Sequence, residues 1–422
     1  MKKDPQLGLS SQFVRPDEIK TKMLPTGMEK GLMRLILKNL GNPDVNVELW
    51  DGETVFPRKQ QAPGIMIKGR SALWRLLTHP TLGFGDEYSV GRIEVEGGIV
   101  PFLDRFFAAY DKRQKESATI LRLFDLYRRV RGNPVSRAKG NIHHHYDIGN
   151  DFYKLWLDKE MVYTCAYFAP NVTTLEEAQA AKMDLVCRKL RLKPGETVID
   201  AGCGWGALAL YMARHYGVKV RAFNLSHEQV AFARERAESE GLASQVEFIE
   251  DDYRTISRDA NGQYDAFVSV GMLEHVGLKH YGELGGVVNR VLGPNGRGLI
   301  HSIGQNQFIP TSEWVDQRIF PGGYPPTLRQ MMDIFEPYDL SVLDVENLRL
   351  HYAETLKHWL DRFDNQLDRV RDLYDESFIR AWRLYLAGSM VNFSGGHLQL
   401  YQVLFTRAQN NSLPVTRDDL YH

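Results

Sequence analysis

The feature that most constrains the fold of this chain is an apolar segment that leads into a glycine-rich loop at residues 198–206. Asp200 ends the apolar run, and three glycines follow it at alternate positions. A helical pattern then begins at Ala207, and a second apolar segment occupies residues 218–223. Glycine allows the backbone to adopt positive φ and to pass close to a ligand. This order predicts an open α/β sheet that binds a ligand at the carboxyl end of a strand.

The spacing of the glycines distinguishes between cofactor classes. It is G-x-G-x-G rather than the dinucleotide pattern G-x-G-x-x-G, which disfavours NAD, and the lysine of a Walker A loop is missing. A carboxylate at Asp200 can accept a hydrogen bond from an α-amino group or attract a cationic ligand. In its strand–loop–helix–strand context the segment resembles motif I of S-adenosylmethionine-dependent methyltransferases.

Two neighbouring segments bear on how such a cofactor would be held. Asn224 stands where the second strand of this motif usually ends in an acidic residue, which leaves ribose recognition to groups such as Asn224 and Gln229. Residues 250–253 place carboxylates after the third strand. They are expected either to reach an adenine amino group or to form an ordinary acidic loop.

The pattern of apolar segments divides the chain into two parts. Residues 45–106 combine strands with helical pieces, with a hairpin turn predicted at Asp51-Gly52 and a helix capped by Ser71. Strands and helices alternate in the later part, as in a parallel α/β sheet. The strands are expected at residues 197–200, 219–223, 246–249, 264–270, 298–302, 340–347 and 399–406. Helical residues 353–393 precede the last strand and either pack in the core or line an acyl pocket.

Four further groups of residues carry a more specific signal. They are residues 145–153 with 161–168, residues 269–277, residues 299–304 and residues 351–356. Together they resemble the cyclopropane-fatty-acyl-phospholipid synthases and the related mycolic-acid cyclopropane synthases. The resemblance covers nearly all of residues 140–407 and extends more weakly into residues 82–91.

The resemblance implies an α/β fold with a Rossmann-like class I methyltransferase sheet, helical lid insertions and a small α+β N-terminal domain. The expected domains are residues 1–127 for lipid docking or dimerisation, a linker at 128–141, and a catalytic domain at 142–422. The implied reaction transfers a methylene group from S-adenosylmethionine to the cis double bond of an unsaturated phospholipid acyl chain. A cyclopropane ring then forms as a carbocation loses a proton.

The resemblance also implies the residues of the site. The family uses a bound bicarbonate ion as the base, with Glu274 orienting it and His301 and Tyr352 anchoring it. The matching ligands, of which Ile303 contributes its backbone, are Cys165, Glu274, His301, Ile303 and Tyr352. The matching cofactor positions are Tyr163, Thr164, Asp200, Gly202, Gly204, Leu225, Gln229, Asp251, Asp252 and His275.

Taken singly, several of these residues have simpler interpretations. A buried His301 is more often a satisfied core histidine, Tyr352 is more often structural, and Cys165 alone is a small buried hydrophobe. Methyl transfer to an alkene needs no covalent enzyme intermediate, so we do not expect Cys165 to act as a nucleophile. The adjacent histidines 143–145 point in different directions and lack a second ligand cluster, so no metal is expected.

Charge and hydropathy limit the partners. The chain has 52 basic and 53 acidic side chains, a balance that argues against nucleic-acid binding. Its apolar segments are too short to span a bilayer. Residues 103–141 nevertheless hold an excess of about six positive charges, which indicates either a solvated helical face or a docking patch for anionic phospholipid. We expect a cytoplasmic homodimer that binds the inner face of the membrane peripherally and reversibly.

Three alternatives to cyclopropane formation stay open at this point. A related lipid C-methyltransferase would resolve the carbocation differently and make a methyl- or methylene-branched fatty acid. A non-catalytic lipid-binding protein would have the methyltransferase fold but not the activity. A small-molecule O- or N-methyltransferase would need neither the N-terminal module nor the apolar helical insertion.

Overall fold

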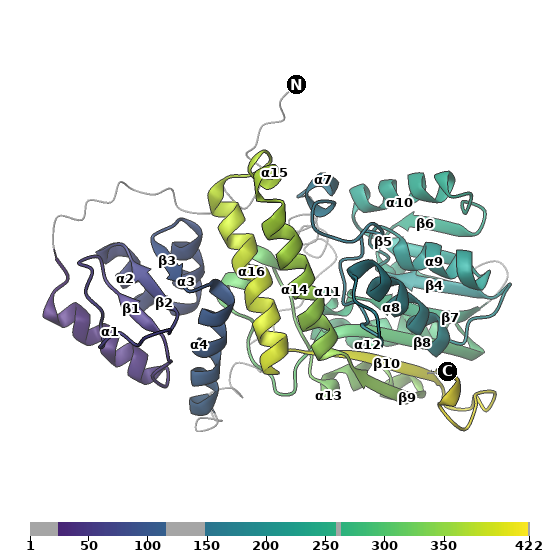
Figure 1. The fold of residues 1–422 in the computed structure, drawn as a ribbon. Coiled ribbons are helices and arrows are strands. Elements are labelled where there is room, and N and C mark those ends of the chain that lie inside the picture. The colour runs from purple at the N-terminus through teal and green to yellow at the C-terminus, as the bar shows by residue number, and fades with distance from the viewer. Residues whose placement is uncertain (1–23, 115–147, 259–262, 421–422) are drawn as a thin grey trace. The chain divides into compact units, whose positions relative to one another are not determined.

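The computed structural model describes residues 24–114, 148–258 and 263–420. The chain separates into two compact units (Figure 1). Of the described residues, the first contains 24–114, 310–321 and 356–395, and the second contains 148–258, 263–309, 322–355 and 396–420. Two late segments thus group with the N-terminal part, whereas the predicted boundary at residue 142 assigns them to the catalytic domain. The predicted linker at residues 128–141 lies outside the described residues.

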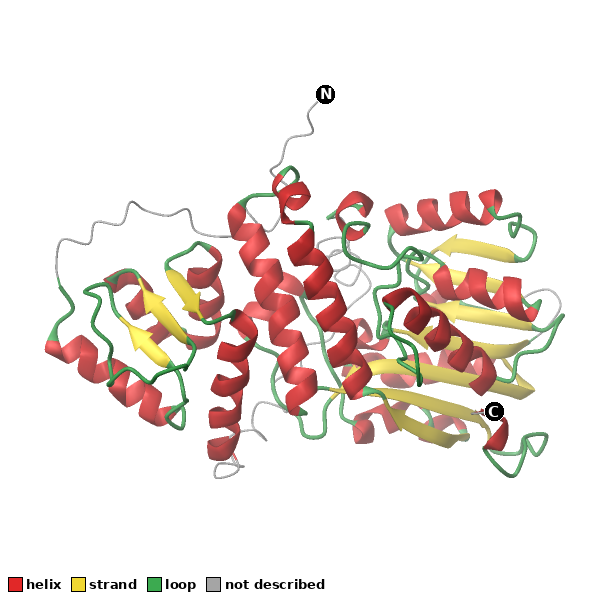
Figure 2. Ribbon diagram, in the orientation of Figure 1, coloured by secondary structure: helices red, strands yellow, loops and turns green. Residues whose placement is uncertain are grey.

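The second unit is built on a mostly parallel seven-stranded sheet, drawn as yellow arrows in Figure 2. Its strands lie in the order β6-β5-β4-β7-β8-β10-β9. Strand β10 is antiparallel to both of its neighbours, and the other pairs are parallel. The bounds are β4 Thr197–Ala201, β5 Lys219–Asn224, β6 Val246–Glu250, β7 Tyr264–Val270, β8 Leu292–Gly304, β9 Leu340–Asn347 and β10 Gln399–Arg407.

Helices cover both faces of this sheet because consecutive strand residues point to opposite sides. Val198 of β4 packs in one core with residues of α8, α9 and α10. Ile199, the next residue, packs in a second core with residues of α11, α12 and α13. The helices are α7 Asn150–Tyr153, α8 Leu175–Lys189, α9 Ala207–Tyr216, α10 His227–Ser239, α11 Leu273–Val276, α12 Tyr281–Val291 and α13 Leu328–Met331, joined by short 3-10 turns such as η2 Tyr253–Thr255.

The first unit has a three-stranded sheet in the order β1-β2-β3. Its strands are β1 Asn46–Glu48, β2 Gly64–Ile67 and β3 Ile93–Glu96. Its helices are α1 Gly27–Asn39, α2 Arg70–Thr78, α3 Pro80–Ser89, α4 Ile99–Gln114, α15 Leu367–Arg371 and α16 Glu376–Gly395, together with a π-helical turn at Val315–Ile319. Helix α14, Arg349–Asn365, crosses from the second unit into the first, and α16 packs against α3 and α4.

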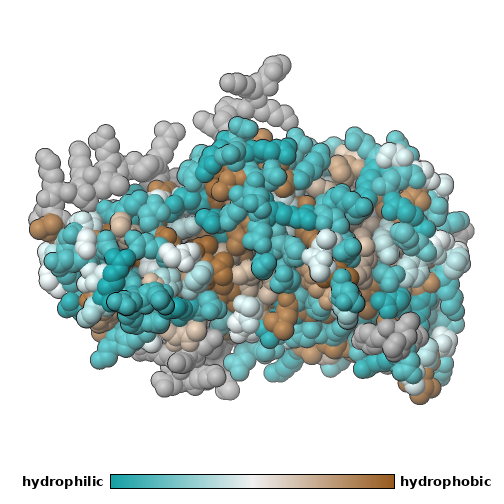
Figure 3. All heavy atoms as spheres, viewed as in Figure 1, coloured by the Kyte–Doolittle hydropathy of each residue, from teal (hydrophilic) through white to brown (hydrophobic). Residues whose placement is uncertain are grey.

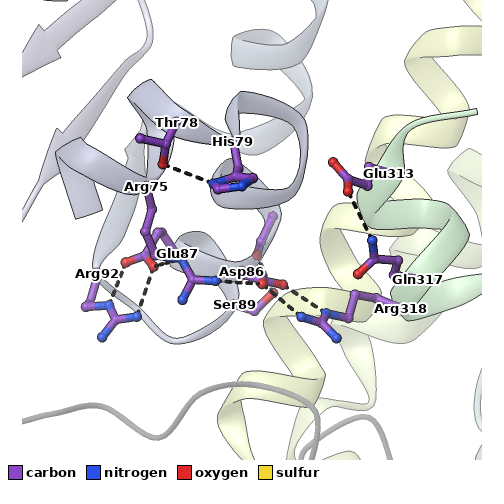
Figure 4. Close-up of polar contacts among 11 residues, drawn as sticks. Arg75, Thr78, His79, Asp86, Glu87, Ser89, Arg92, Glu313, Gln317 and Arg318 are labelled. Atoms are coloured by element: carbon purple, nitrogen blue, oxygen red, sulfur yellow. Dashed lines mark hydrogen bonds and ion pairs between the residues drawn. The ribbon is translucent and has the colours of Figure 1, made fainter. Parts of the chain in front are cut away.

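Buried ion pairs connect the segments of the first unit (Figure 4). The carboxylate of Asp86 in α3 accepts hydrogen bonds from Arg318 at 3.0 and 3.1 Å and from Arg75 at 3.4 Å. Its neighbour Glu87, which is fully buried, is paired with Arg92 at 2.5 and 2.9 Å. Figure 4 shows the Arg318 guanidinium reaching Asp86 from the segment that contains the π-helical turn.

Most of the predicted strands, and the helices predicted between them, are confirmed. Three local features differ from the predictions. Strand β8 begins at Leu292 rather than at residue 298, because Leu292 pairs with Tyr264 before an irregularity in the register. The prediction that Ser71 caps a helix is wrong, since α2 begins at Arg70 and Gly69 occupies the cap. The turn at Asp51-Gly52 is present, with an antiparallel bridge between residues 48 and 54, but β1 and β2 themselves pair in parallel.

The burial and hydropathy of the described residues bear on the expected surfaces. Trp359, Phe363 and Val370 of the helical insertion are fully buried, which fits core packing. Hydrophilic side chains predominate on the face shown in Figure 3. Within the described residues, no helix combines the length and apolar character that a bilayer span requires. The basic residues after position 114 and the histidines 143–145 lie outside the described residues.

Candidate active site

The glycine-rich loop between β4 and α9 can be formed only with glycine at two of its positions. Gly202 has a φ of +88°, and a Cβ there would lie 2.8 Å from Met272 Cβ. Gly206 has a φ of +84°, and a Cβ there would lie 2.6 Å from the ring of Phe248. The loop is also tied to the neighbouring strand, since the amide of Gly202 donates to the carbonyl of Phe223 at 2.8 Å.

A pocket opens where β4, β5, β6 and β7 end. Its lining residues are Gly202, Phe223, Asn224, Leu225, Asp251, Asp252, Tyr253, Arg254, Met272, His275 and Val276. Five of the ten predicted cofactor positions are among them. This is the place where an open α/β sheet binds its ligand.

The other five predicted cofactor positions are not among the lining residues. The ring of Tyr163 packs against Tyr153 at 5.4 Å between centroids. Asn224 connects two more of them, because its Nδ2 donates to the carbonyl of Gly204 at 3.2 Å and to Gln229 Oε1 at 2.7 Å. Gln229 Nε2 is buried and has no hydrogen-bond partner among the described residues, so it is a donor available for a ligand. Asn224 is committed to internal bonds, which leaves Gln229 as the better candidate for ribose recognition.

The acidic residues after β6 differ in their bonding. Asp252 accepts hydrogen bonds from Arg254 at 2.7 and 2.8 Å. Burial alone would raise the pKa of Asp252, but the bonds from Arg254 outweigh it and hold that pKa below its usual value. Asp251 uses Oδ1 to accept from the amide of Asp252 at 2.8 Å. Of the two, Asp251 has the carboxylate that is not paired with an arginine.

A buried lysine that sequence reasoning missed lies next to Thr164 and Asp200. Lys182 of α8 is 2% exposed, and its Nζ donates to Thr164 Oγ1 at 3.0 Å. Burial raises the pKa of Asp200 to about 7, with the charge of Lys182 opposing the rise. Burial also lowers the pKa of Lys182 to about 8, against the influence of Cys165, Asp158 and Asp200. The one available signal was its position on the buried face of α8, one turn after Ala178 and one turn before Val186.

Glu274, one of the predicted catalytic residues, is held against the end of β8. Glu274 lies in α11, directly after β7, and its Oε1 accepts a hydrogen bond from the amide of Ile303 at 2.6 Å. Its Oε2 is buried and has no hydrogen-bond partner among the described residues. Burial raises the pKa of Glu274 to about 7, although the bond from Ile303 opposes this.

His301 belongs to the same edge of the sheet. It pairs with Val270 in the register of β7 and β8, two residues before Ile303. Its Nδ1 lies 3.1 Å from Gln402 Nε2, and its own Nε2 is buried without a hydrogen-bond partner in the described residues. Burial, reinforced by the charges of Lys182 and Lys189, lowers the pKa of His301 well below its usual value, so the ring is neutral at pH 7.

The Cys165 thiol and the backbone amide of Tyr352 both donate to one carbonyl group. The Cys165 thiol donates to the carbonyls of Ala166 at 3.1 Å and Leu348 at 3.9 Å, and the amide of Tyr352 donates to the same Leu348 oxygen at 3.2 Å. Leu348 is in turn bonded to Leu400, the register partner of Ile303. Burial raises the pKa of the Cys165 thiol far above its usual value, so a nucleophilic thiolate is disfavoured.

The start of α14 is held against residues 166–168 by two contacts that no motif indicated. The amide of Ala166 donates to Thr355 Oγ1 at 3.0 Å, and the amide of Phe168 donates to His351 Nδ1 at 3.0 Å. These bonds position the segment that carries Cys165. They involve side chains of ordinary type, so only the folded chain reveals them.

Comparisons with known proteins identify the same family that the sequence motifs resemble. A family model described as mycolic acid cyclopropane synthetase matches residues 134–403. Residues 32–117 match a second model, described only as a domain of unknown function.

Two curated relatives cover most of the chain. A probable fatty acid methyltransferase of Pseudomonas putida is 36% identical over 89% of this chain and 96% of its own length. A cyclopropane-fatty-acyl-phospholipid synthase of Escherichia coli (strain K12) is 38% identical over 84% of this chain and 90% of its own length.

Solved structures match the later part of the chain. A cyclopropane synthase of Mycobacterium tuberculosis is 28% identical, with a TM-score of 0.60 over 65% of this chain and 98% of that one. A mycolic acid cyclopropane synthase complexed with SAH and CTAB is 29% identical, with a TM-score of 0.60 over 63% of this chain and 97% of that one.

Proposed function

This chain belongs to the mycolic acid cyclopropane synthetase family, and we propose that it converts the cis double bond of an unsaturated phospholipid acyl chain into a cyclopropane ring. It is an S-adenosylmethionine-dependent methyltransferase, and its C-terminal part has the predicted class I methyltransferase fold. The substrate assignment goes further and rests on the E. coli relative, whose name states that activity. It also rests on a site that combines an unpartnered carboxylate oxygen with an unpartnered imidazole nitrogen.

The reaction that we propose has two steps. The π electrons of the alkene attack the sulfonium methyl group, the carbon–sulfur bond breaks, and S-adenosylhomocysteine leaves. The resulting carbocation then loses a proton from the transferred methyl group as the ring closes. Five residues that line the pocket would hold the cofactor, namely Gly202, Leu225, Asp251, Asp252 and His275. Tyr163, Thr164, Asp200, Gly204 and Gln229 would also hold it.

The residues at the sheet edge fit a small oxyanion with a hydroxyl group. Glu274 Oε2 can accept a hydrogen bond and His301 Nε2 can donate one, since neither atom has a partner among the described residues. The resemblance to the family adds Cys165 and Tyr352 to this set. Bicarbonate has this combination of groups, and when bound it would supply the base for the departing proton. A neutral His301 also avoids placing a second positive charge beside the carbocation.

The decisive test is lipid mass spectrometry. Purified protein with S-adenosylmethionine and unsaturated phospholipid vesicles should yield acyl chains heavier by one CH₂ that resist hydrogenation. A product that still carries a double bond or a simple methyl branch would contradict ring closure. Turnover of soluble substrates without vesicles would favour a small-molecule methyltransferase, and failure to bind cofactor would favour a non-catalytic lipid-binding protein.

A second candidate function is methyl- or methylene-branching of the same acyl chains. The Pseudomonas putida relative is a probable fatty acid methyltransferase, and a tuberculostearic acid methyltransferase of Mycobacterium tuberculosis is 32% identical over 87% of this chain. Both names are compatible with a carbocation that is resolved without ring closure. The presence of Cys165, Glu274, His301, Ile303 and Tyr352 as a complete set favours the cyclopropane product.

The proposed substrate implies a membrane partner. We propose that the protein binds the cytoplasmic face of the membrane reversibly, and that it does so as a homodimer. The basic excess in residues 103–141 supports the first part of this proposal, because anionic lipid attracts such a segment.

A further inference from the structure

A line of buried polar contacts extends behind His301, away from the proposed ligand. Lys189 at the end of α8 contacts Gln402 of β10, and Gln402 contacts His301 of β8. We propose that Gln402, held by Lys189, is a positioning residue that keeps His301 in the neutral tautomer with its proton on Nε2. This inference deepens the proposed function, and its consequence for catalysis rests on that function.

Lys189 determines which way the amide of Gln402 points. Its side chain is fully buried, and Nζ donates to Gln402 Oε1 at 2.7 Å and to Glu346 Oε2 at 2.5 Å. The carboxylate of Asp344 is a further 4.0 Å contact. A charged ammonium group has three donors and no acceptor, so the amide atom that faces it must be the oxygen. The amide nitrogen of Gln402 is therefore turned toward His301.

Gln402 in turn determines which nitrogen of His301 carries the proton. Gln402 Nε2 lies 3.1 Å from His301 Nδ1, and an amide NH₂ group can only donate. Nδ1 must then accept, and the proton of the neutral ring is on Nε2. An imidazolium would oppose one N–H to another at this contact. Burial and the charges of Lys182 and Lys189 disfavour that form as well.

This tautomer decides what the sheet edge offers to a ligand. His301 Nε2 and Glu274 Oε2 are both buried without hydrogen-bond partners in the described part of the chain. With the proton on Nε2, the edge presents one donor and one acceptor, which suits an ion that has both a lone pair and a hydroxyl group. With the proton on Nδ1, both atoms would be acceptors, and an anion would be repelled. His301 thus holds an oxygen atom and does not act as the base.

The tautomer can be measured directly and changed at Gln402. Nitrogen-15 NMR of histidine-labelled protein distinguishes the two tautomers, and His301→Gln identifies the signal among the 13 histidines. We expect Nε2–H in the unchanged protein. In Gln402→Glu a carboxylate can accept from both Lys189 and Nδ1–H, so the proton should move to Nδ1. Gln402→Met contacts neither group and should give a mixture of tautomers.

The same variants should alter turnover in a way that a purely structural role would not. Losing a hydrogen bond to a charged ligand corresponds to a roughly 10- to 100-fold fall in kcat for Gln402→Glu. The dissociation constant for S-adenosylmethionine should stay unchanged, and Gln402→Met should need more bicarbonate for half-maximal activity. Gln399→Glu is the matched control, because this buried amide on the same strand bonds Asn347 and Gly396 instead.

The outcomes separate this inference from the proposed function. A proton on Nδ1 in the unchanged protein would overturn the inference, as would an unchanged His301 spectrum in both Gln402→Glu and Gln402→Met. The expected spectra in a protein that makes no cyclopropane lipid would support the tautomer and reject the proposed function. If Gln402→Glu does not fold, Gln402→Met decides the question.

Discussion

At the residue scale, the proposed chemistry depends on two side chains, Glu274 and His301, and on the residues that support them. Glu274 follows the end of β7, His301 lies within β8 near its end, and both are buried with an unpartnered polar atom. Lys182 and Gln402 are buried polar residues of α8 and β10, and they contact Thr164 and His301 across the fold. No local pattern encodes such a contact, so these two could not be predicted.

The raised pKa of Glu274 predicts a conflict between stability and activity. The folded-state pKa of about 7 is above the usual 4.5, so the folded protein holds this proton longer than the unfolded chain. The contribution of Glu274 to stability therefore falls as pH rises from about 4.5 to about 7, by roughly 3 kcal/mol in all. Glu274→Gln keeps an oxygen for the amide of Ile303 and carries no charge. We expect it to lose most turnover, retain cofactor affinity and unfold at higher denaturant concentration at pH 8.

The control for this prediction is Glu283→Gln. The side chain of Glu283 is 47% exposed, so its removal should change neither turnover nor the pH dependence of unfolding. Urea titrations at pH 5 and pH 8 measure the effect, and Glu274→Gln should gain stability only at the higher pH. An equal change in the stability of Glu274→Gln at both pH values would show that burial does not keep the carboxyl group of Glu274 protonated.

At the element scale, the sheet was predicted well because strands that are buried on both faces are short apolar runs. Val198 and Ile199 pack on opposite faces of β4, so both residues are apolar, and such a run identifies the strand without its partners. The start of β8 was harder to predict because Pro294 and Gly296 look like a turn, while Leu292 is paired through contacts with β7. Element ends depend on such partners more than element centres do.

The junction of β4 and α9 gives a prediction at this scale. Gly206→Ala would put a residue at a φ of +84° and a Cβ 2.6 Å from the ring of Phe248. The left-handed backbone costs about 1–2 kcal/mol, and the overpacking adds about 1–3 kcal/mol. Gly241→Ala is the matched control, because Gly241 has a φ of +71° with open space around it. Denaturant unfolding should show the backbone cost in both variants and the overpacking cost only in Gly206→Ala. Calorimetry should also show weaker cofactor binding in Gly206→Ala.

At the scale of the whole molecule, the sequence indicated two parts but not which segments would join them. Residues 310–321 and 356–395 follow much of the catalytic sheet in the sequence, yet they group with the N-terminal segment. Arg380 of α16 illustrates the reason, since it pairs with Glu94 at 3.0 Å and bonds the carbonyl of Tyr88 at 2.6 Å. Contacts between residues so far apart leave no periodic signal.

The pair of Asp86 and Arg318 tests how the first unit is held together. Asp86 is 4% exposed and accepts two hydrogen bonds from Arg318, so Asp86→Asn should cost about 2 kcal/mol of unfolding free energy. Glu96→Gln breaks an exposed ion pair with Arg58 and should cost at most about 1 kcal/mol. Chemical denaturation of both variants measures the difference. Equal costs would mean that the contact with Arg318 does not stabilise the unit.

Membrane binding is a property of the whole molecule, and charge makes it measurable. Replacing Arg128, Arg129 and Arg131 by serine removes three positive charges, each worth about 1 kcal/mol near anionic lipid. We expect roughly 100-fold weaker binding to vesicles that contain anionic phospholipid at low ionic strength, with the difference shrinking as salt is added.

The control removes three exposed lysines of the second unit (Lys159, Lys193 and Lys219), so that the net charge is matched. Vesicle sedimentation over a salt series gives the answer. Equal losses in both triple variants would mean that net charge matters and its location does not, and salt-independent binding would show that apolar contacts dominate.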